Sequence, residues 1–205
     1  FPRLMDLDAD GDMDIASAQY FADNTNGDSF VWFEQAEDGW NTHTIDGDQG
    51  PAIQLSLVED FYGDGRMIAI GSNHTNVADG DRWESGIFAY ALPDDPTAPW
   101  PGTMISEGIV SLESPQFGKQ AAPGIFGTGD IDGDGDADIV VSGDGDPRVF
   151  WLEQIGPDNF ETHVLVANRR QAGGMEIVDF DGDGQTEIVV SGYDDNIISI
   201  FQAVR

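Results

Sequence analysis

The chain has no cysteine and only one lysine, Lys119, among its 205 residues. Without cysteine there can be no disulfide framework, and thiols give no information on the redox compartment. No run approaches the roughly 18 consecutive apolar residues that a membrane-spanning helix needs, so we expect no membrane insertion. The chain has no signal peptide and begins with Phe1 rather than methionine, so we expect a mature fragment or a processed product.

Basic residues are scarce throughout. Eight lysines and arginines face 39 acids, which gives a formal net charge of −31. Such a charge repels phosphates, so it argues against a nucleic-acid partner and disfavours an anionic membrane surface. Three bound Ca²⁺ ions would still leave about −25, so most of the charge lies on the surface. An acid-rich, lysine-poor surface is typical of proteins from saline habitats, where salt screens the repulsion; an ordinary acidic secreted protein is the equal alternative.

An acidic loop occurs four times. The stretch from Asp130 to Asp138 reads DIDGDGDAD, with carboxylates at alternate positions and glycines between them. Related stretches begin at Asp6, Asp60 and Asp179, at separations of 54, 70 and 49 residues. A repeat of this length is typical of propellers and other repeat arrays.

The segments between the loops repeat as well. A β-prone run follows each loop, as at 139–143 and 188–192, and a second run, at 31–35, matches 150–154. A third run, at 40–45, matches 160–165. With one more apolar segment before each loop, every unit contains four short strands and none shows a helical period.

This pattern predicts an all-β fold, a β-propeller of four-stranded antiparallel blades in a single domain over 1–205. The blades are expected at approximately 1–48, 49–110, 120–168 and 172–205. The last is incomplete because it lacks a counterpart of the third run. We therefore expect a segment of a larger propeller with about four blades present; a compact four-blade ring is the alternative.

The acidic loop predicts a calcium site, because crowded carboxylates need a cation and Ca²⁺ accepts about six to eight oxygen ligands. Counting the first aspartate as position 1, carboxylates fall at positions 1, 3, 5 and 9. Position 7 offers a backbone carbonyl, and glycine at position 6 allows a sharp turn. We expect about three Ca²⁺ sites, with candidate metal ligands Asp6, Asp8, Asp10, Asp12 and Asp14; Asp130, Asp132, Asp134, Asp136 and Asp138; and Asp179, Asp181, Asp183, Gln185 and Glu187.

An EF-hand begins in the same way but needs a glutamate at position 12 and a following helix. Position 12 is Ser17, Val141 or Val190, followed by β-branched residues, so the loop joins two strands. A strand, an Asp-x-Asp-x-Asp-Gly-x-x-Asp loop and a second strand, repeated over the whole chain, resemble the FG-GAP/VCBS repeats of integrin α-subunit heads and microbial secreted proteins. The resemblance implies calcium-binding propeller blades, with a backbone oxygen at position 7 and a ligand at position 9 that closes the site.

The second loop departs from this pattern. It keeps Asp60, Asp64 and its turn glycines, but has Tyr62 at position 3 and Ile68 at position 9. We expect a loop of the same shape without a strong Ca²⁺ site, with Arg66 neutralising the remaining charge. A fold that tolerates this loss favours a stiffening role for the metal over a reactive one.

Other residues outside the loops are weaker candidates. The repeated His43 and His163 favour strand packing over catalysis, as do the repeated tryptophans. Trp83 and Trp100 do not repeat, and either could stack on a sugar ring or anchor the proline-rich segment. Asn73 begins a sequon, Asn-His-Thr, and is a candidate for N-glycosylation.

Three functions remain open at this point. The first is a calcium-stabilised, non-catalytic extracellular module, secreted or at the cell surface, for adhesion or recognition of a glycan or protein. The second, implied by the resemblance, is part of a polysaccharide lyase or dehydratase propeller; scarce basic residues and the lack of a nucleophile motif make an enzyme the less favoured reading. The third is a structural unit of a cell-surface or filament assembly. Further blades of the same protein are an expected partner.

Overall fold

The computed structural model describes residues 2–20, 28–75, 82–107, 109, 121–143, 147–169 and 171–202. These residues form fifteen β-strands in four antiparallel sheets, without a helix in the described ranges. Nowhere in that part of the chain does the structure contain a helix long and apolar enough to cross a membrane. The all-β class and its division into repeated sheets are therefore confirmed, whereas closure into a propeller stays a prediction.

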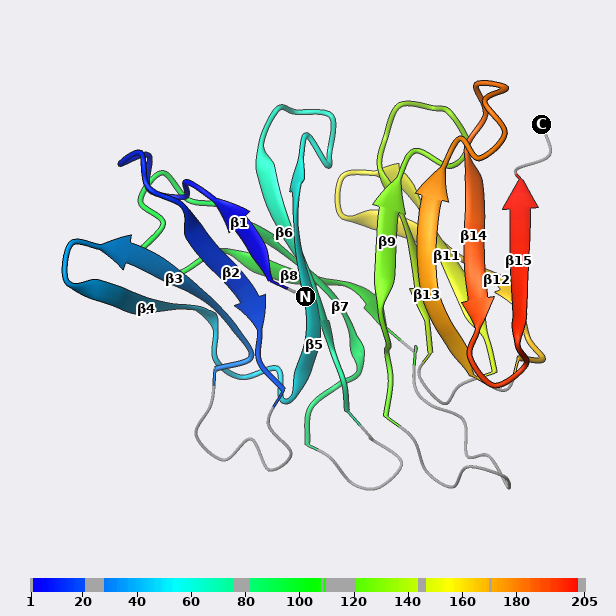
Figure 1. The fold of residues 1–205 in the computed structure, drawn as a ribbon, viewed down its shortest axis with the longest axis horizontal. Helices are drawn as coiled ribbons and strands as arrows, with labels where there is room; N and C mark the ends of the chain where they lie inside the picture. The colour runs from blue at the N-terminus through cyan, green and yellow to red at the C-terminus, as the bar shows by residue number, and fades with distance from the viewer. Residues whose placement is uncertain are drawn as a thin grey trace.

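Each sheet is a meander whose strands follow chain order, and the four sheets stand side by side from blue to red in Figure 1. Sheet 1 has β1 (Arg3–Met5), β2 (Asp14–Ala18), β3 (Phe30–Ala36) and β4 (Gly39–Asp46). Sheet 2 has β5 (Ala52–Glu59), β6 (Met67–Asn73), β7 (Gly86–Ala91) and β8 (Gly102–Glu107). Sheet 3 has β9 (Phe126–Gly129), β10 (Asp138–Ser142), β11 (Val149–Gly156) and β12 (Asn159–Val166). Sheet 4 has three strands, β13 (Ala172–Val178), β14 (Glu187–Gly192) and β15 (Ile197–Gln202).

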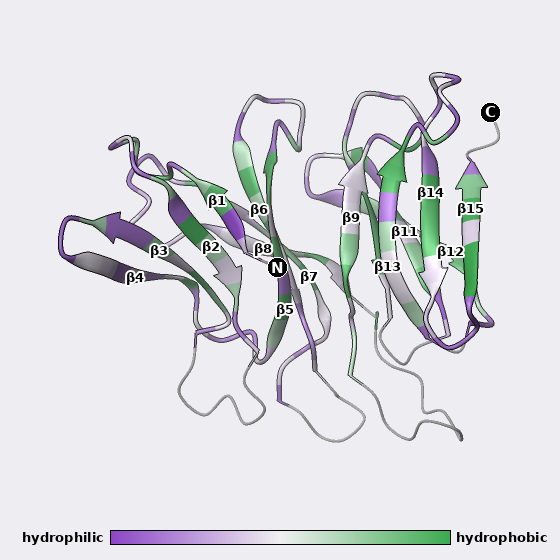
Figure 2. Cartoon of the chain, viewed as in Figure 1, coloured by the Kyte–Doolittle hydropathy of each residue, from purple (hydrophilic) through white to green (hydrophobic). Residues whose placement is uncertain are grey.

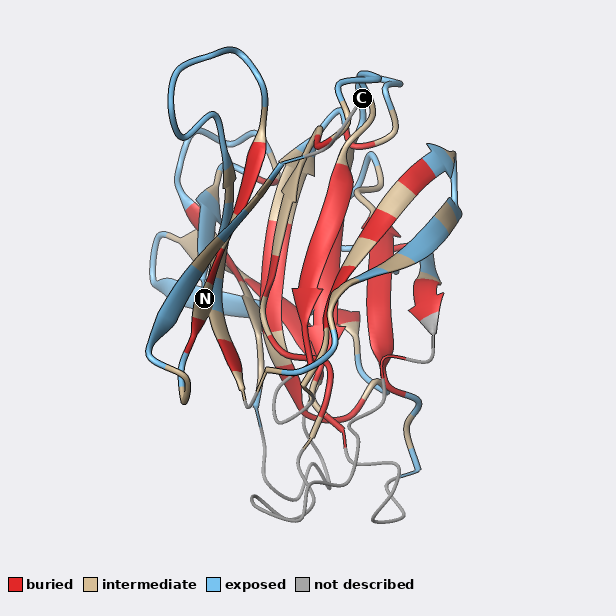
Figure 3. Cartoon of the chain, turned by 90° about the vertical axis from the view of Figure 1, so that its right-hand side faces the viewer, coloured by how far each residue is buried: buried red, intermediate tan, exposed pale blue. Residues whose placement is uncertain are grey.

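The hydrophobic core lies between neighbouring sheets. Successive side chains of a strand point to opposite faces, so a buried strand packs against the sheets on both sides of it. In β10, Ile139 and Val141 pack toward sheet 2, while Val140 packs toward sheet 4. Figures 2 and 3 show hydrophobic, buried segments along the inner strands and polar, exposed ones at the hairpins. The apolar runs of the sequence thus form three inter-sheet cores.

The second and third strands keep one register throughout the repeat. Ala16 pairs with Trp32, Val140 with Trp151, and Val189 with Ile200. In sheets 1, 3 and 4 the residue before the loop pairs with position 9, as Gly129 does with Asp138. In sheet 2 the pairing is shifted by one, with Glu59 opposite Met67 at position 8. Positions along the second strand can therefore be compared in all four sheets, whereas the second loop closes one residue earlier.

The repeated histidines belong to the packing of the outer strands. The His43 ring stacks on Trp32 at a centroid distance of 4.4 Å, and its Nε2 lies 2.7 Å from Glu34 Oε2. In sheet 3, His163 lies 4.8 Å from the Trp151 ring and 2.6 Å from Glu153 Oε2. The His43 hydrogen bond lowers the pKa of Glu34, helped by one from Asn41. This duplicated arrangement fits the packing interpretation.

Candidate metal centres

Three of the four loops bring carboxylates together. Oxygens of Asp6, Asp8 and Asp10 lie within 4.8 Å of one another, as do those of Asp130, Asp132 and Asp134. The fourth loop gathers Asp179, Asp181 and Glu187 in the same way. Oxygen-only groups at this spacing match the preference of Ca²⁺ for carboxylate ligands.

The aspartate at position 1 also builds the turn. Its carboxylate accepts a hydrogen bond from the backbone N–H of the glycine at position 6: Gly11, Gly65, Gly135 or Gly184. These glycines have φ between 80° and 103°, where a side chain is strained. Because Asp60 makes the same bond in the second loop, retention of this aspartate does not by itself indicate a metal ligand.

Position 4 has a positive φ as well. It is glycine in three loops, Gly63, Gly133 and Gly182, but Ala9 in the first, with φ of 61°. A non-glycine residue in this region is disfavoured. The first loop therefore carries local backbone strain at Ala9, which its Asp–Gly pattern does not indicate.

The carboxylates at positions 3 and 5 are oriented by short-range hydrogen bonds. Asp132 Oδ1 accepts from the backbone N–H of Asp134, and Asp134 Oδ1 accepts from that of Asp136. The first loop repeats both bonds, from Asp10 to Asp8 and from Asp12 to Asp10. These turns orient the side chains within the loop.

The position 9 carboxylate is buried and joins the loop to the sheet. Asp138 Oδ2 accepts from Ile131 N at 3.1 Å, and its Oδ1 accepts from Gln154 N at 2.8 Å. Asp14 makes the equivalent bonds to Leu7 and Gln35. The tight carboxylate groups of these two loops comprise positions 1, 3 and 5, so position 9 has a scaffold role beside any contact with a metal.

The fourth loop differs in its details. Glu187 Oε2 accepts from Phe180 N at 2.8 Å and Oε1 from Gln202 Nε2 at 2.9 Å. Both oxygens of Asp183 accept hydrogen bonds from Gln185, one from its backbone and one from its side chain. The close carboxylate group of the fourth loop therefore contains Glu187, at position 9, in place of Asp183 at position 5.

The electrostatics of the loops favour a cation. Partial desolvation, together with Asp10, Asp14 and Glu34, raises the pKa of Asp8. Desolvation and nearby carboxylates likewise raise the pKa of Asp132. Burial raises the pKa of Asp138 to about 6, although two backbone N–H donors oppose the shift. These three carboxylates are held where their charge is unfavourable, and a bound Ca²⁺ would reverse this.

The second loop neutralises its acids with a basic side chain. Arg66 pairs with Asp64 at 2.5 Å and also donates through Nε at 2.7 Å. Tyr62 turns away and donates its hydroxyl to Asp158 in sheet 3 at 2.8 Å, while Ile68 enters the core. In the described part of the chain, no arginine forms such an ion pair with the carboxylates of the first or fourth loop.

Comparison with protein families gives a match over the part of the chain that holds the third and fourth loops. Residues 130–190 match the family model of the FG-GAP-like repeat. This range contains both loops and the whole of β10 to β13, and so extends from sheet 3 into sheet 4. No curated protein matches the chain. The match supports a β-propeller-like module.

Two candidates from the sequence are corrected by burial. Trp100 is only 4% exposed, and its indole N–H donates to Pro96 O at 2.9 Å, so its ring is a core element and offers no face to a ligand. Asn73 is fully buried; its amide nitrogen donates to Gln49 O and Glu84 O, and its oxygen accepts from Gly86 N. A side chain held in this way has no room for a glycan.

Trp83 keeps partial exposure. Its indole N–H donates to Asp48 at 3.1 Å, the Arg82 guanidinium lies 4.3 Å from its ring centroid, and Gly50 approaches it so closely that an added Cβ would lie 2.7 Å from Cδ2. Its role in ligand stacking stays a prediction.

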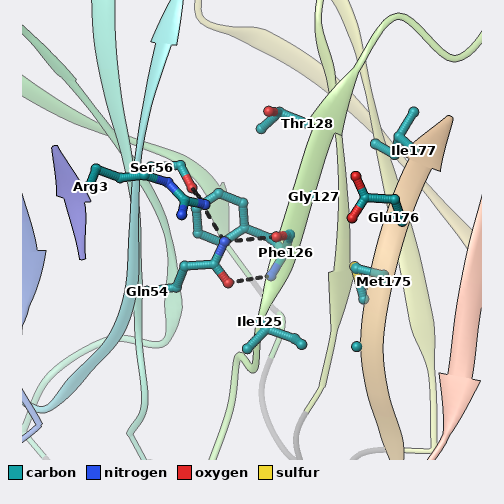
Figure 4. Close-up of a pocket in the computed structure, with 11 residues that line it drawn as sticks. Arg3, Gln54, Ser56, Ile125, Phe126, Gly127, Thr128, Met175, Glu176 and Ile177 are labelled. Carbon is teal, nitrogen blue, oxygen red and sulfur yellow. Dashed lines mark hydrogen bonds between the residues drawn. The ribbon is translucent and has the colours of Figure 1, made fainter. Parts of the chain in front are cut away.

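A hollow between the first strands was not anticipated. The cavity volume is about 360 Å³, and β5, β9 and β13 line it together with Arg3 (Figure 4). Gln54 closes one wall by donating to Phe126 O at 2.8 Å and accepting from Phe126 N at 3.1 Å. The Arg3 guanidinium donates to Ser56 Oγ at 3.1 Å, and Glu176 projects from the opposite wall. Its residues come from four sheets and share no sequence pattern.

Proposed function

We propose that this chain is a calcium-stabilised module of an extracellular β-propeller that recognises a glycan or protein. The proposal is carried by the contrast among the four loops. Where carboxylates at positions 3 and 9 are lost, Arg66 and the Tyr62–Asp158 bond stabilise the loop; where they are kept, three acids converge. A divalent cation at the convergent loops supplies the missing charge.

The candidate ligand site is the hollow beside Arg3. Ligand sites are concave and combine apolar walls with a few converging polar groups. Here Met175 and Ile125 provide apolar surface, while Ser56 and Thr128 provide hydroxyls. Within the described residues, Arg3 forms no ion pair, so an anionic group of the ligand is the expected partner of its guanidinium.

Calcium is tested by thermal unfolding with and without a chelator at matched ionic strength. Ligand that binds the folded state alone adds stability by mass action, about 2.7 kcal/mol at a hundredfold excess over Kd. We therefore expect chelation to lower Tm well beyond the effect of salt, and Asp134→Asn to remove one site while the other two still bind. An unchanged melting curve would rule out a structural ion.

Ligand recognition is tested on a glycan array, with wild type and Arg3→Gln compared. We expect binding of acidic glycans that Arg3→Gln weakens, while calcium binding stays unchanged. A parallel lyase assay addresses the enzymatic alternative: appearance of an unsaturated product from an acidic polysaccharide would replace recognition by catalysis.

A further inference from the structure

One face of sheet 4 is largely apolar, with Glu176 on its first strand as a charged exception, and has no neighbouring sheet in the described part of the chain. Residues 188 and 190 point toward sheet 3, so Val178, Val189, Ile198 and Ile200 point away from it. Ile198 is 71% exposed and Ile200 is 48% exposed. Phe180, at position 2 of the fourth loop, is 61% exposed. We call these five residues the leading face.

The same positions are buried in the other sheets. The register matches Ile200 with Trp32 and Trp151, and Ile198 with Phe30, Ile87 and Val149. All of these except Trp151 are fully buried, and Trp151 packs against the core shared by sheets 3 and 4.

Phe180 follows the same rule. Its counterparts at position 2, Leu7, Phe61 and Ile131, are all less than 9% exposed. Three times in this chain, therefore, the surface equivalent to the leading face is covered by the following sheet.

Sheet 1 carries the complementary half of this interface on its far side. Arg3, Ala16 and Trp32 point toward sheet 2, so the cross-strand row Leu4–Ile15–Phe33 points away from it. The corresponding row of sheet 4, Ile177–Ile188–Phe201, packs back on sheet 3. Leu4 is 65% exposed. We call Leu4, Ile15 and Phe33 the trailing face.

We propose that two copies of this chain associate head to tail, with the leading face of one copy packed on the trailing face of the other. The geometry points to this partner because the contact continues the interface that already joins each sheet to the next. The two faces differ, so the contact is heterologous: it forms a closed ring or an open chain.

The charge of the chain sets the salt dependence of this association. Each copy has a net charge of −31, so the copies repel one another at low ionic strength. The contact itself is apolar, and salt screens the repulsion without weakening the contact. Association is therefore strengthened by added salt. This assembly requires neither the cation nor the glycan, so it can be tested apart from them.

The test is sedimentation equilibrium of the 205-residue chain with two face variants. Ile198→Asp disrupts the leading face and Leu4→Asp the trailing face; Ile155→Asp, at a 53% exposed residue of the β11–β12 hairpin, is the matched control. A charge at the centre of an apolar contact weakens it by about 30-fold or more. We expect wild type and Ile155→Asp to associate and each face variant alone to be monomeric, with melting curves that show all four proteins folded.

The mixture of the two face variants is decisive. Leu4→Asp keeps its leading face and Ile198→Asp its trailing face, so an equimolar mixture must form a one-to-one heterodimer through a single intact contact. A monomeric wild type over the whole concentration range would overturn the proposal. Self-association of either face variant at wild-type strength, or a mixture that stays monomeric, would overturn it as well.

Discussion

Phe61 and Phe180 offer a direct test of how the loops contribute to stability. Both follow the first aspartate of their loop, yet Phe61 is fully buried and Phe180 is 61% exposed. Phe61 lies in the core between sheets 2 and 3, with its ring 6.1 Å from that of Phe160, and its backbone carbonyl accepts from Gln154 Nε2 at 3.1 Å. The second loop is therefore attached to sheet 3 by packing and a hydrogen bond.

Alanine substitutions at the two positions should differ clearly in the stability that they remove. Replacing a buried phenylalanine by alanine costs about 3–5 kcal/mol through lost transfer free energy and the cavity that remains. For a chain of this length that lowers Tm by roughly 10 °C. Phe61→Ala should show this loss, whereas Phe180→Ala, at an exposed site, should change the free energy of unfolding by less than about 1 kcal/mol.

Urea unfolding followed by circular dichroism measures both variants at a dilution where the chain is monomeric. The midpoint should fall for Phe61→Ala at an unchanged slope. Equal losses at both positions, or no loss at Phe61, would refute the inference that the second loop is held by inter-sheet packing.

Two further predictions concern the third loop, the second of them with the first loop as its comparison. The first compares wild type with Asp138→Asn in the absence of metal. The free energy of unfolding of wild type, relative to that of the variant, should decline from pH 4 to pH 7, because the raised pKa of Asp138 means that folding favours the protonated carboxyl group. Solvent screening reduces the decline to about 1–2 kcal/mol. Saturating Ca²⁺ should abolish the decline, and a rise with pH in its absence would contradict the burial argument. The second compares position 4 in two loops. Gly133→Ala should lower the free energy of unfolding by about 1–2 kcal/mol, whereas Ala9→Gly relieves the same backbone strain and should leave it unchanged or raise it. Equal losses for the two variants in thermal unfolding would contradict the strain argument.

Local features of the fold could be predicted from the sequence. Alternating apolar runs and turn residues identified the strands, and the shared Asp–Gly pattern located the four loops, because both depend on neighbouring residues only. The last unit lacks a counterpart to residues 160–165, and its described residues form a sheet of three strands. The altered second loop was also visible, since Tyr62 and Ile68 replace carboxylates within one short motif.

Features that depend on distant residues could not be predicted. Tyr62 bonds to Asp158, which lies 96 positions away, and no local pattern indicates that contact. The Asn73 sequon is a valid tripeptide, but its burial depends on β7 and the segments at Gln49 and Glu84. Trp100 was open to two interpretations because residue type does not determine burial.

The metal hypothesis is tested most directly by the calcium stoichiometry of the chain in equilibrium dialysis after complete removal of bound metal. We expect three bound calcium ions per chain for wild type and two for Asp134→Asn. We also expect three for Arg66→Gln, because the second loop lacks carboxylates at positions 3 and 9. No bound calcium at millimolar concentration, or a fourth ion in wild type, would contradict the account.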